Sequence, residues 1–314
     1  MAKRPRLTVL AGGVGAAKFL RGLLRAADPS TLTIIVNTGD DERFFGLAVS
    51  PDLDAITYTA AGLANPRTGW GVRDDTFHCL ASLGRFYRET WFQLGDRDLA
   101  THIYRTQRLA AGARLSTVTA EIGRALGSPV RVLPMTDDPV RTVLYTRSGM
   151  LTLQDYLVRR RARPAVRTIR YVGASRARPA SGVLAAIRES AAVIIAPSNP
   201  LLSIGPILAI PGVRRTLERR TGPTVAVSPL VGGRAPSGPL ARQLRRLGLR
   251  PSAAGIAACY RPFLDALLID RRDRAESAAL AAVGCRAIVA DTLFTTERRA
   301  AAATRCLLRA LTLA

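Results

Sequence analysis

The stretch from Arg6 to Ala27 reads RLTVLAGGVGAAKFLRGLLRAA and joins an apolar run to an amphipathic one through three glycines. The apolar residues at 7–11 predict a buried strand, and the segment after Gly15 predicts a helix. Glycines allow a tight turn between the two and a close approach of other backbone. A strand that passes through such a turn into a helix indicates an α/β fold, in which ligands bind at the carboxyl ends of the strands.

The same alternation of strand and helix continues along the chain. After a second strand at 32–36, further strands are predicted at six apolar or β-branched runs: 130–135, 167–173, 191–198, 224–230, 265–270 and 286–291. Helices are predicted between several of them, for example at 181–189, 238–247 and 296–310. Residues 141–156 differ and predict a hairpin that turns at 147–149. The alternation favours an α/β fold with a mostly parallel sheet and helices on both faces.

Domain organisation follows from the same pattern. Residues 51–127 hold more helix signals than strand signals, and the chain contains no internal repeat and no disordered linker. We therefore expect a single domain over 1–314, with a core of about 5–50 and 130–314 and a smaller helical insertion of about 51–127.

An acidic segment directly follows the second predicted strand. Five acidic residues lie between Val36 and Tyr58, in a chain with only 23 of them and a net charge of +23: Asp40, Asp41, Glu42, Asp52 and Asp54. Helix-start chemistry accounts for one, because Ser50 suits an N-cap, Pro51 the first helical position and Asp52 the first turn. A simple turn at 39–41 is the structural alternative for the first two.

The functional interpretation of this segment is a site for a hard cation. Two or three carboxylates can hold Mg²⁺ against phosphate oxygens, and the candidates are Asp40, Asp41 and Asp54. A loop with this much negative charge approaches phosphate only when a cation lies between them. The cation would offset the charge that builds up during phosphoryl transfer.

The glycine turn is the first of two further candidate ligand sites. Gly12, Gly13 and Gly15 let a phosphate approach the backbone, and the amides of the following helix can receive an anion. Lys18 adds positive charge one helical turn further on. The turn is not G-x-G-x-x-G, because Lys18 replaces the last glycine, and it lacks the Gly-Lys-Ser/Thr end of a Walker loop. A turn without a ligand is the structural alternative.

The second candidate follows the strand at 191–198, in IIAPSNPLLSIGPIL. Ser198, Asn199, Ser203 and Gly205 offer hydroxyl, amide and backbone donors where a nucleotide would bind, although a ligand-free proline-rich turn is the alternative. Four prolines interrupt the uncharged run from 191 to 213. We therefore interpret that run as a buried strand, an ordered loop and a short helix, and expect no membrane span.

Bulk composition limits the class of protein. The positive charge comes almost entirely from arginine, and its simplest interpretation is a solvated, codon-biased surface, which would also attract phosphorylated ligands. Aromatic residues make up only 5% and the arginines are scattered, so we expect no nucleic-acid partner. Four isolated cysteines and an N-terminal apolar run too short for a signal peptide predict a cytoplasmic protein.

Together these segments resemble the 2-phospho-L-lactate transferase family, which builds the deazaflavin coenzyme F-420. The matching text occurs in the family's order and covers most of residues 7–230: VLAGGVGAAKFLRGL, VNTGDDERFFGLAVSPDLDAITY, GWGVRDDTF, LGDRDLATHIYRTQRL, YVGA and APSNPLLSIGPILAIPGVRRTL. Each glycine turn alone is a weak signal, whereas the ordered set is specific. The resemblance implies a Rossmann-like α/β core with a smaller helical part.

The resemblance also implies an enzyme that transfers substituted phosphate groups. It would move phospholactate, phosphoenolpyruvate or 3-phosphoglycerate from a guanosine diphosphate-linked donor to the ribityl hydroxyl of the deazaflavin Fo, with Mg²⁺, and release GMP. No residue decides among the three acids. We expect Fo and the donor as partners, no membrane partner, and a homodimer that buries the apolar C-terminal helices.

The family's motifs, carried onto this sequence, imply a metal held by Asp40 and Asp54, with Asp41 as a third catalytic carboxylate. The implied substrate-binding residues are Gly12, Gly13, Gly15, Lys18, Thr38, Trp70, Asp75, Thr76, Arg97, Ser198, Asn199, Ser203 and Gly205. Trp70 would place the flat deazaflavin, although a core tryptophan is equally consistent with its pattern. His102 suits a packed or capping position better than a general base.

Two alternatives remain open at this stage. A nucleotide-sugar-binding regulator of carbon metabolism with the same fold, without catalysis, shares the glycine turn and an acidic pair but lacks the PDLD, GWG and GDRDLATH series. A nicotinamide-dependent oxidoreductase would need the missing third glycine, and several carboxylates crowd a position that suits one at a ribose.

Overall fold

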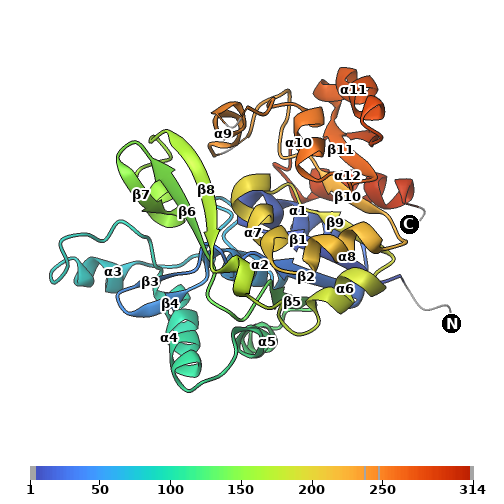
Figure 1. Cartoon of the computed structure of the whole chain (residues 1–314). Helices are drawn as coiled ribbons and strands as arrows, with labels where there is room; N and C mark the ends of the chain where they lie inside the picture. The colour runs from blue at the N-terminus through green and yellow to red at the C-terminus, as the bar shows by residue number, and fades with distance from the viewer. Residues whose placement is uncertain (1–4, 237, 247, 312–314) are drawn as a thin grey trace.

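The computed structural model describes residues 5–236, 238–246 and 248–311, and its main feature is a seven-stranded sheet (Figure 1). The strand order is β12-β11-β10-β9-β1-β2-β5, and every neighbouring pair runs parallel. The strands are β1 (Leu7–Ala11), β2 (Leu32–Val36), β5 (Arg131–Pro134), β9 (Ala192–Ile195), β10 (Thr224–Val227), β11 (Ala266–Asp270) and β12 (Arg286–Ala290). The predicted α/β, Rossmann-like fold is confirmed.

Helices cover both faces of this sheet because successive strand residues point to opposite sides. Val9 and Ile34 belong to one core, and Leu10 and Ile35 belong to the other. The first face carries α1 (Gly13–Ala26), α2 (Pro51–Ala60) and α12 (Glu297–Ala310). The second carries α6 (Val183–Glu189), α7 (Gly205–Ala209), α8 (Val213–Arg219), α9 (Leu240–Arg246), α10 (Ala253–Cys259) and α11 (Ser277–Ala282). Each fully buried aliphatic side chain contributes about 1.5–3 kcal/mol to this packing.

A small antiparallel sheet of order β7-β6-β8 lies beside the main one (Figure 1). Its strands are β6 (Arg141–Thr146), β7 (Gly149–Thr152) and β8 (Val166–Val172). The predicted hairpin is confirmed, since Thr146 pairs with Gly149. The strand predicted at 167–173 forms as β8, but it pairs with β6 and not with the parallel sheet. A further hairpin, β3 (Glu42–Phe44) with β4 (Leu47–Val49), occupies a segment that the sequence predicted as a loop.

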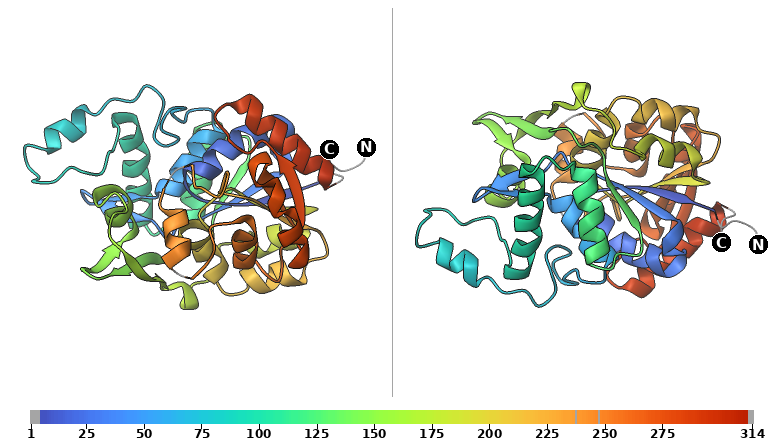
Figure 2. Two further views of the ribbon diagram at one scale, coloured as in Figure 1. Left: turned by 90° about the horizontal axis from the view of Figure 1, so that it is seen from above. Right: turned by 90° about the horizontal axis from the view of Figure 1, so that it is seen from below.

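The segment between β2 and β5 is rich in helix, as predicted. Besides α2 it contains α3 (His78–Leu83), α4 (Asp96–Ala110) and α5 (Leu115–Ala125). Helices α2 and α5 pack against β5, whereas α3 and α4 project with the small sheet on one side of the molecule (Figures 1 and 2). Within the described residues, no helix is both long and apolar enough to cross a membrane. The domain boundaries stay a prediction.

Candidate functional site

The N-terminus of α1 is closed by side chains from distant segments. The Gly13 amide donates to Asp52 Oδ1 over 2.7 Å, and the Gly12 amide donates to Ser198 Oγ over 3.3 Å. A Cβ on Gly12 would lie 2.5 Å from Asp52 Oδ2, so glycine is required for this approach. Two amides of the glycine turn, where the sequence predicted a close approach of phosphate, are therefore already engaged, one of them by a carboxylate.

Asp52 forms a pair with Asp40 through a shared amide. The side-chain amide of Asn37 donates to Asp52 Oδ2 over 2.9 Å and to Asp40 Oδ1 over 3.2 Å. Gln154 Nε2 donates to the other oxygen of Asp40 over 3.2 Å. We call Asp40 and Asp52 the cavity pair, because both line the large cavity described below and accept their side-chain hydrogen bonds from neutral amides.

Burial disfavours the ionised forms of the two carboxyl groups of the cavity pair. Burial raises the pKa of Asp40 well above its usual range, and the charges of Asp52 and Asp41 raise it further. Burial also raises the pKa of Asp52 to about 6, against the opposing hydrogen bonds from Asn37 and Gly13. A divalent cation relieves this kind of repulsion, and carboxylate oxygens are its preferred ligands. The residues of the cavity pair therefore fit Mg²⁺.

The two other aspartates of the acidic segment have different partners. Asp41 accepts from Ser50 Oγ over 2.8 Å through one oxygen, and its other oxygen is buried without a hydrogen-bond partner among the described residues. Asp54 accepts from Arg105 through both oxygens, one over 3.0 Å and the other at short range. Arg105 is only 1% exposed, so this is a buried, bidentate ion pair that already neutralises Asp54.

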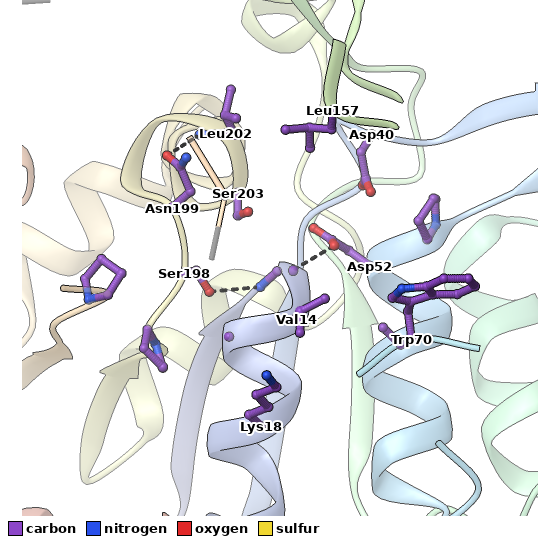
Figure 3. A pocket seen from close by; sticks show the side chains of 18 of the residues that line it. Val14, Lys18, Asp40, Asp52, Trp70, Leu157, Ser198, Asn199, Leu202 and Ser203 are labelled. Carbon is purple, nitrogen blue, oxygen red and sulfur yellow. Dashed lines mark hydrogen bonds between the residues drawn. The ribbon is translucent and has the colours of Figure 1, made fainter. Parts of the chain in front are cut away.

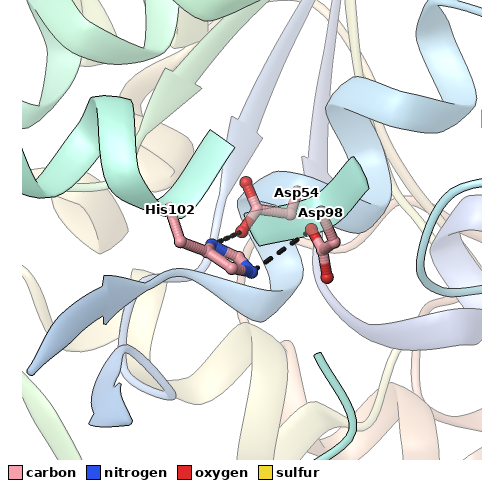
Figure 4. Close-up of side chains that lie close together, drawn as sticks. All are labelled: Asp54, Asp98 and His102. Atoms are coloured by element: carbon pink, nitrogen blue, oxygen red, sulfur yellow. Dashed lines mark ion pairs between the residues drawn. The ribbon is translucent and has the colours of Figure 1, made fainter. Parts of the chain in front are cut away.

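Asp54 also belongs to a buried network of side chains, and its neighbours Tyr58, Asp98 and His102 line the same cavity. Figure 4 shows Asp54, Asp98 and His102. His102 lies between two carboxylates, with Nε2 3.2 Å from Asp98 Oδ1 and Nδ1 3.7 Å from Asp54 Oδ2. Tyr58 donates to Asp98 over 2.6 Å, and Arg105 Nη1 lies 3.3 Å from His102 Nδ1. We call these five residues the rear network.

The rear network contains its own positive charge. Burial would raise the pKa of Asp98, but hydrogen bonding and charge from His102, with Tyr58 and Arg105, hold it below its usual value. Burial and the charges of Asp54 and Asp98 raise the pKa of Tyr58 well above its usual range. Oxygen and nitrogen atoms of Asp54, Asp98 and His102 that could bind a metal lie within 4.8 Å of one another. The Arg105 guanidinium, however, already supplies the positive charge that a bound cation would supply there.

A cavity of about 720 Å³ opens beyond the carboxyl ends of the parallel strands (Figure 3). Gly12 follows β1, Ser198 follows β9, Ser228 follows β10 and Thr292 follows β12, and all four line it. The predicted site residues in its lining are Gly12, Gly13, Gly15, Lys18, Asp40, Asp54, Trp70, Ser198, Asn199 and Ser203. Trp70 is 40% exposed at the rim, between Gly69 and Gly71, which both have positive φ.

The remaining predicted residues lie outside that lining: Thr38, Asp41, Asp75, Thr76, Arg97 and Gly205. Asp75 accepts from the amides of Arg97 and Asp98 and so caps the start of α4. Thr76 donates to Asp96, whose carboxylate caps α3. A Cβ on Gly205 would lie 2.0 Å from Tyr171 Oη, which makes that glycine a packing requirement. Ligand contacts by these residues stay a prediction.

Asn199 lines the cavity, and its side chain already makes three hydrogen bonds within the protein. Its oxygen accepts from the amides of Leu201 and Leu202, which begins the π-helical turn Pro200–Ile204, and its Nδ2 donates to Gln243 Oε1. A ligand that displaced the bonds at the oxygen would break this cap, whereas one that accepted from the second Nδ2 hydrogen would not. Its predicted role toward guanosine is not tested by this geometry and stays a prediction.

Sequence reasoning missed several lining residues. Asp52 was assigned to a helix start, and it does lie in the first turn of α2, but its carboxylate turns toward α1. The PDLD spacing was the available signal, since residues two apart on a helix face different sides. Phe92, Gln154 and Leu157 come from loops and from the turn after β7, and no sequence pattern marked them.

Three comparisons with known proteins show what this chain is similar to. The model of the family described as 2-phospho-L-lactate transferase CofD matches residues 7–305. The chain is 44% identical over 291 residues to a phosphoenolpyruvate transferase of Streptomyces coelicolor, covering 90% of this chain and 91% of the relative. It is 38% identical over 293 residues to a 2-phospho-L-lactate transferase of Methanosarcina acetivorans, covering 93% and 95%.

A solved structure from Bacillus halodurans, described as a member of the UPF0052 family, has the same fold. Its TM-score is 0.60 over 92% of this chain and 93% of the other, at 17% sequence identity. At that identity the likeness concerns the fold alone.

Proposed function

The chain belongs to the 2-phospho-L-lactate transferase family, as a transferase of coenzyme F-420 biosynthesis, and on that premise we propose its substrates and its metal. The acceptor is the deazaflavin Fo, and the donor is a phospho-organic acid linked to guanosine through a diphosphate. The terminal ribityl hydroxyl of Fo attacks the phosphorus that carries the organic acid. The bond from that phosphorus to the bridging oxygen breaks, and GMP leaves.

The single observation that supports this most is the position of the cavity pair. Asp40 and Asp52 lie beside the glycine turn, at the strand ends where a diphosphate would bind in an α/β fold. We propose that this pair holds Mg²⁺, in place of the pair Asp40 and Asp54 implied by the sequence resemblance, because Arg105 already neutralises Asp54. When bound, Mg²⁺ would offset the negative charge of the diphosphate.

The residues of the chain then have separate tasks. Gly12 and Gly15 let the chain's own Asp52 and Pro197 pack against the start of α1, since a Cβ on Gly15 would lie 2.3 Å from the carbonyl oxygen of Pro197. A carboxylate of the cavity pair orients the attacking hydroxyl. The exposed face of Trp70 stacks on the flat ring system of the acceptor.

For the organic acid, we propose phosphoenolpyruvate as the first candidate. Relatives named phosphoenolpyruvate transferase are 42–44% identical to this chain, whereas those named 2-phospho-L-lactate transferase are 35–38% identical. The two acids differ by a few atoms, so the distinction rests on relatives and not on one contact.

The test supplies the purified protein with Fo, Mg²⁺ and each of the three guanylylated donors in turn, and identifies the products by mass. We expect the dehydro form of coenzyme F-420-0 and GMP from the phosphoenolpyruvate donor, at the highest kcat/KM of the three. Absence of any Fo-phosphodiester product with all three donors would exclude the proposed reaction. A higher kcat/KM with phospholactate or 3-phosphoglycerate would exclude only the proposed acid. The homodimer and the cytoplasmic location stay predictions, which size-exclusion chromatography with light scattering and cell fractionation would check.

A further inference from the structure

A second cleft, of about 610 Å³, lies next to the large cavity and shares Leu157, Gly238 and Pro239 with it. Three segments form it: the chain after the π-helical turn Asp155–Arg159, the loop before α9, and α9 itself. Its lining contains four arginines and no acidic residue among the described residues: Arg161, Arg234, Arg242 and Arg245.

These four guanidinium groups have no carboxylate within ion-pair distance among the described residues. Within the described part of the chain, none of the four forms an ion pair, whereas Arg108 is paired with Glu121 and Arg159 with Glu89. All four are exposed, and they gather around one concave surface rather than along a flat one. Such a cluster concentrates positive potential, because field lines focus in a cleft.

The backbone holds part of this cluster in place. Arg161 and Ala162 are consecutive non-glycine residues with φ of 51°, a conformation that such residues rarely adopt. Arg242 donates a short hydrogen bond to the Ala162 carbonyl, which ties α9 to this turn. The wall of the cleft is therefore a constrained turn bonded to a helix.

The four arginines of the lining indicate which class of ligand the cleft would bind. Guanidinium groups bind phosphate oxygens through paired hydrogen bonds, and four of them exceed what a single carboxylate or phosphate monoanion requires. A di- or triphosphate carries a matching number of charges, and the volume lies in the range of ordinary small-molecule sites. We propose that this arginine cleft binds an oligophosphate group, free or carried by a nucleotide, at a site separate from the transferase cavity. The proposal does not rest on the identity of the transferase substrates.

The test measures binding of inorganic triphosphate by calorimetry, without Fo or donor. EDTA is present so that no divalent cation bridges the anion to the cavity pair, and the salt concentration is about 150 mM to screen diffuse attraction. The cleft variant is Arg234→Gln with Arg245→Gln, since neither side chain forms a hydrogen bond or ion pair with the described residues that the substitution would remove. The control is Arg305→Gln with Arg309→Gln, which removes the same two charges from the exposed side of α12.

We expect saturable binding whose Kd rises roughly tenfold or more in the cleft variant and stays within about twofold in the control. Absence of saturable binding, or equal losses in both variants, overturns the proposal, because net charge alone would then explain any attraction. A second titration with a nucleoside triphosphate distinguishes the two sources. An equal Kd indicates that the phosphates alone are bound, and a lower Kd indicates that the nucleoside adds contacts.

Discussion

The cavity pair and the rear network both contain aspartates from one short acidic segment. The buried negative charge is stabilised differently in the two groups. Burial disfavours the ionised forms of Asp40 and Asp52, and the neutral amides that donate to them offset this only in part. Asp54 has the buried guanidinium of Arg105 against both of its oxygens. In the function proposed above, the first arrangement takes a cation from solution, whereas the second is neutralised within the chain.

Helix geometry explains how neighbouring residues reach such different places. Asp52 and Asp54 are two residues apart on α2, and two residues correspond to about 200° around a helix axis. Both residues line the cavity, but the Asp52 carboxylate is bonded to the start of α1 and the Asp54 carboxylate to Arg105 of α4. An acidic cluster in a sequence can thus contain both a ligand site and a structural ion pair.

The largest effect is expected from neutralising the cavity pair. Asp40→Asn and Asp52→Asn should each lower kcat by about a thousandfold, since losing a metal ligand removes several kcal/mol of charge stabilisation. Steady-state kinetics over a range of Mg²⁺ concentrations would measure this, with circular dichroism to confirm folding. Asp41→Asn is the matched control, because Asp41 does not line the cavity, and it should retain more activity. Turnover undiminished in both variants of the pair would remove the metal assignment.

The next effect concerns the stability of the rear network. Arg105→Met leaves the buried charge of Asp54 without a partner and should lower the free energy of unfolding by about 3–5 kcal/mol. The double variant with Asp54→Asn should recover part of that loss, because the orphan charge is gone. Urea titration of both variants would measure the difference. Equal stabilities of the single and double variants would mean that the ion pair is not the source of the loss.

A smaller expected effect is a pH-dependent difference in stability between Asp52→Asn and the natural chain. The pKa of Asp52 in the folded protein is about 6, against a reference value of 3.8. The protonated Asp52 side chain therefore makes its whole contribution to stability below about pH 3.8, and this contribution is lost as the pH rises through 6. Without divalent cation, Asp52→Asn should therefore be more stable than the natural chain at pH 7.5, by about 2–3 kcal/mol, and lose this advantage as the pH falls from about 6 to 3.8. Thermal unfolding in EDTA would measure it.

The same comparison can be repeated with Mg²⁺ present. Because the ion binds the ionised pair, it should raise the Tm of the natural chain at pH 7.5 more than that of Asp52→Asn. Asp291→Asn serves as the control, since that carboxylate is about half exposed. Parallel pH profiles for the natural chain and Asp52→Asn would contradict the assigned environment of Asp52.

The smallest effect concerns an acid that lies outside both groups. Asp75→Ala removes a cap of α4 and should lower the free energy of unfolding by about 1–2 kcal/mol, with the KM for Fo within about twofold. Trp70→Ala should instead raise that KM roughly tenfold by loss of stacking. If Asp75→Ala raises the KM for Fo as much as Trp70→Ala does, Asp75 contacts the acceptor as the resemblance implied.

Much of the fold could be predicted because it depends on local pattern. The parallel strands and the hairpin at 141–152 were predicted from apolar runs and turn residues, whose periods are properties of short segments. The partner of β8 and the short hairpin β3–β4 were not predicted. Pairing depends on which strands meet in space, and three-residue strands carry too little pattern to be seen.

By itself the sequence determined the α/β class, the glycine turn after β1 and the presence of an acidic segment at the end of β2. These follow from residue type and spacing, which act over a few neighbouring positions. Only the tertiary structure decided that Asp52 faces the cavity, that Arg105 neutralises Asp54, and that Asp75 caps a helix. Charge compensation depends on distances between segments dozens of residues apart, and those distances exist only once the chain has packed.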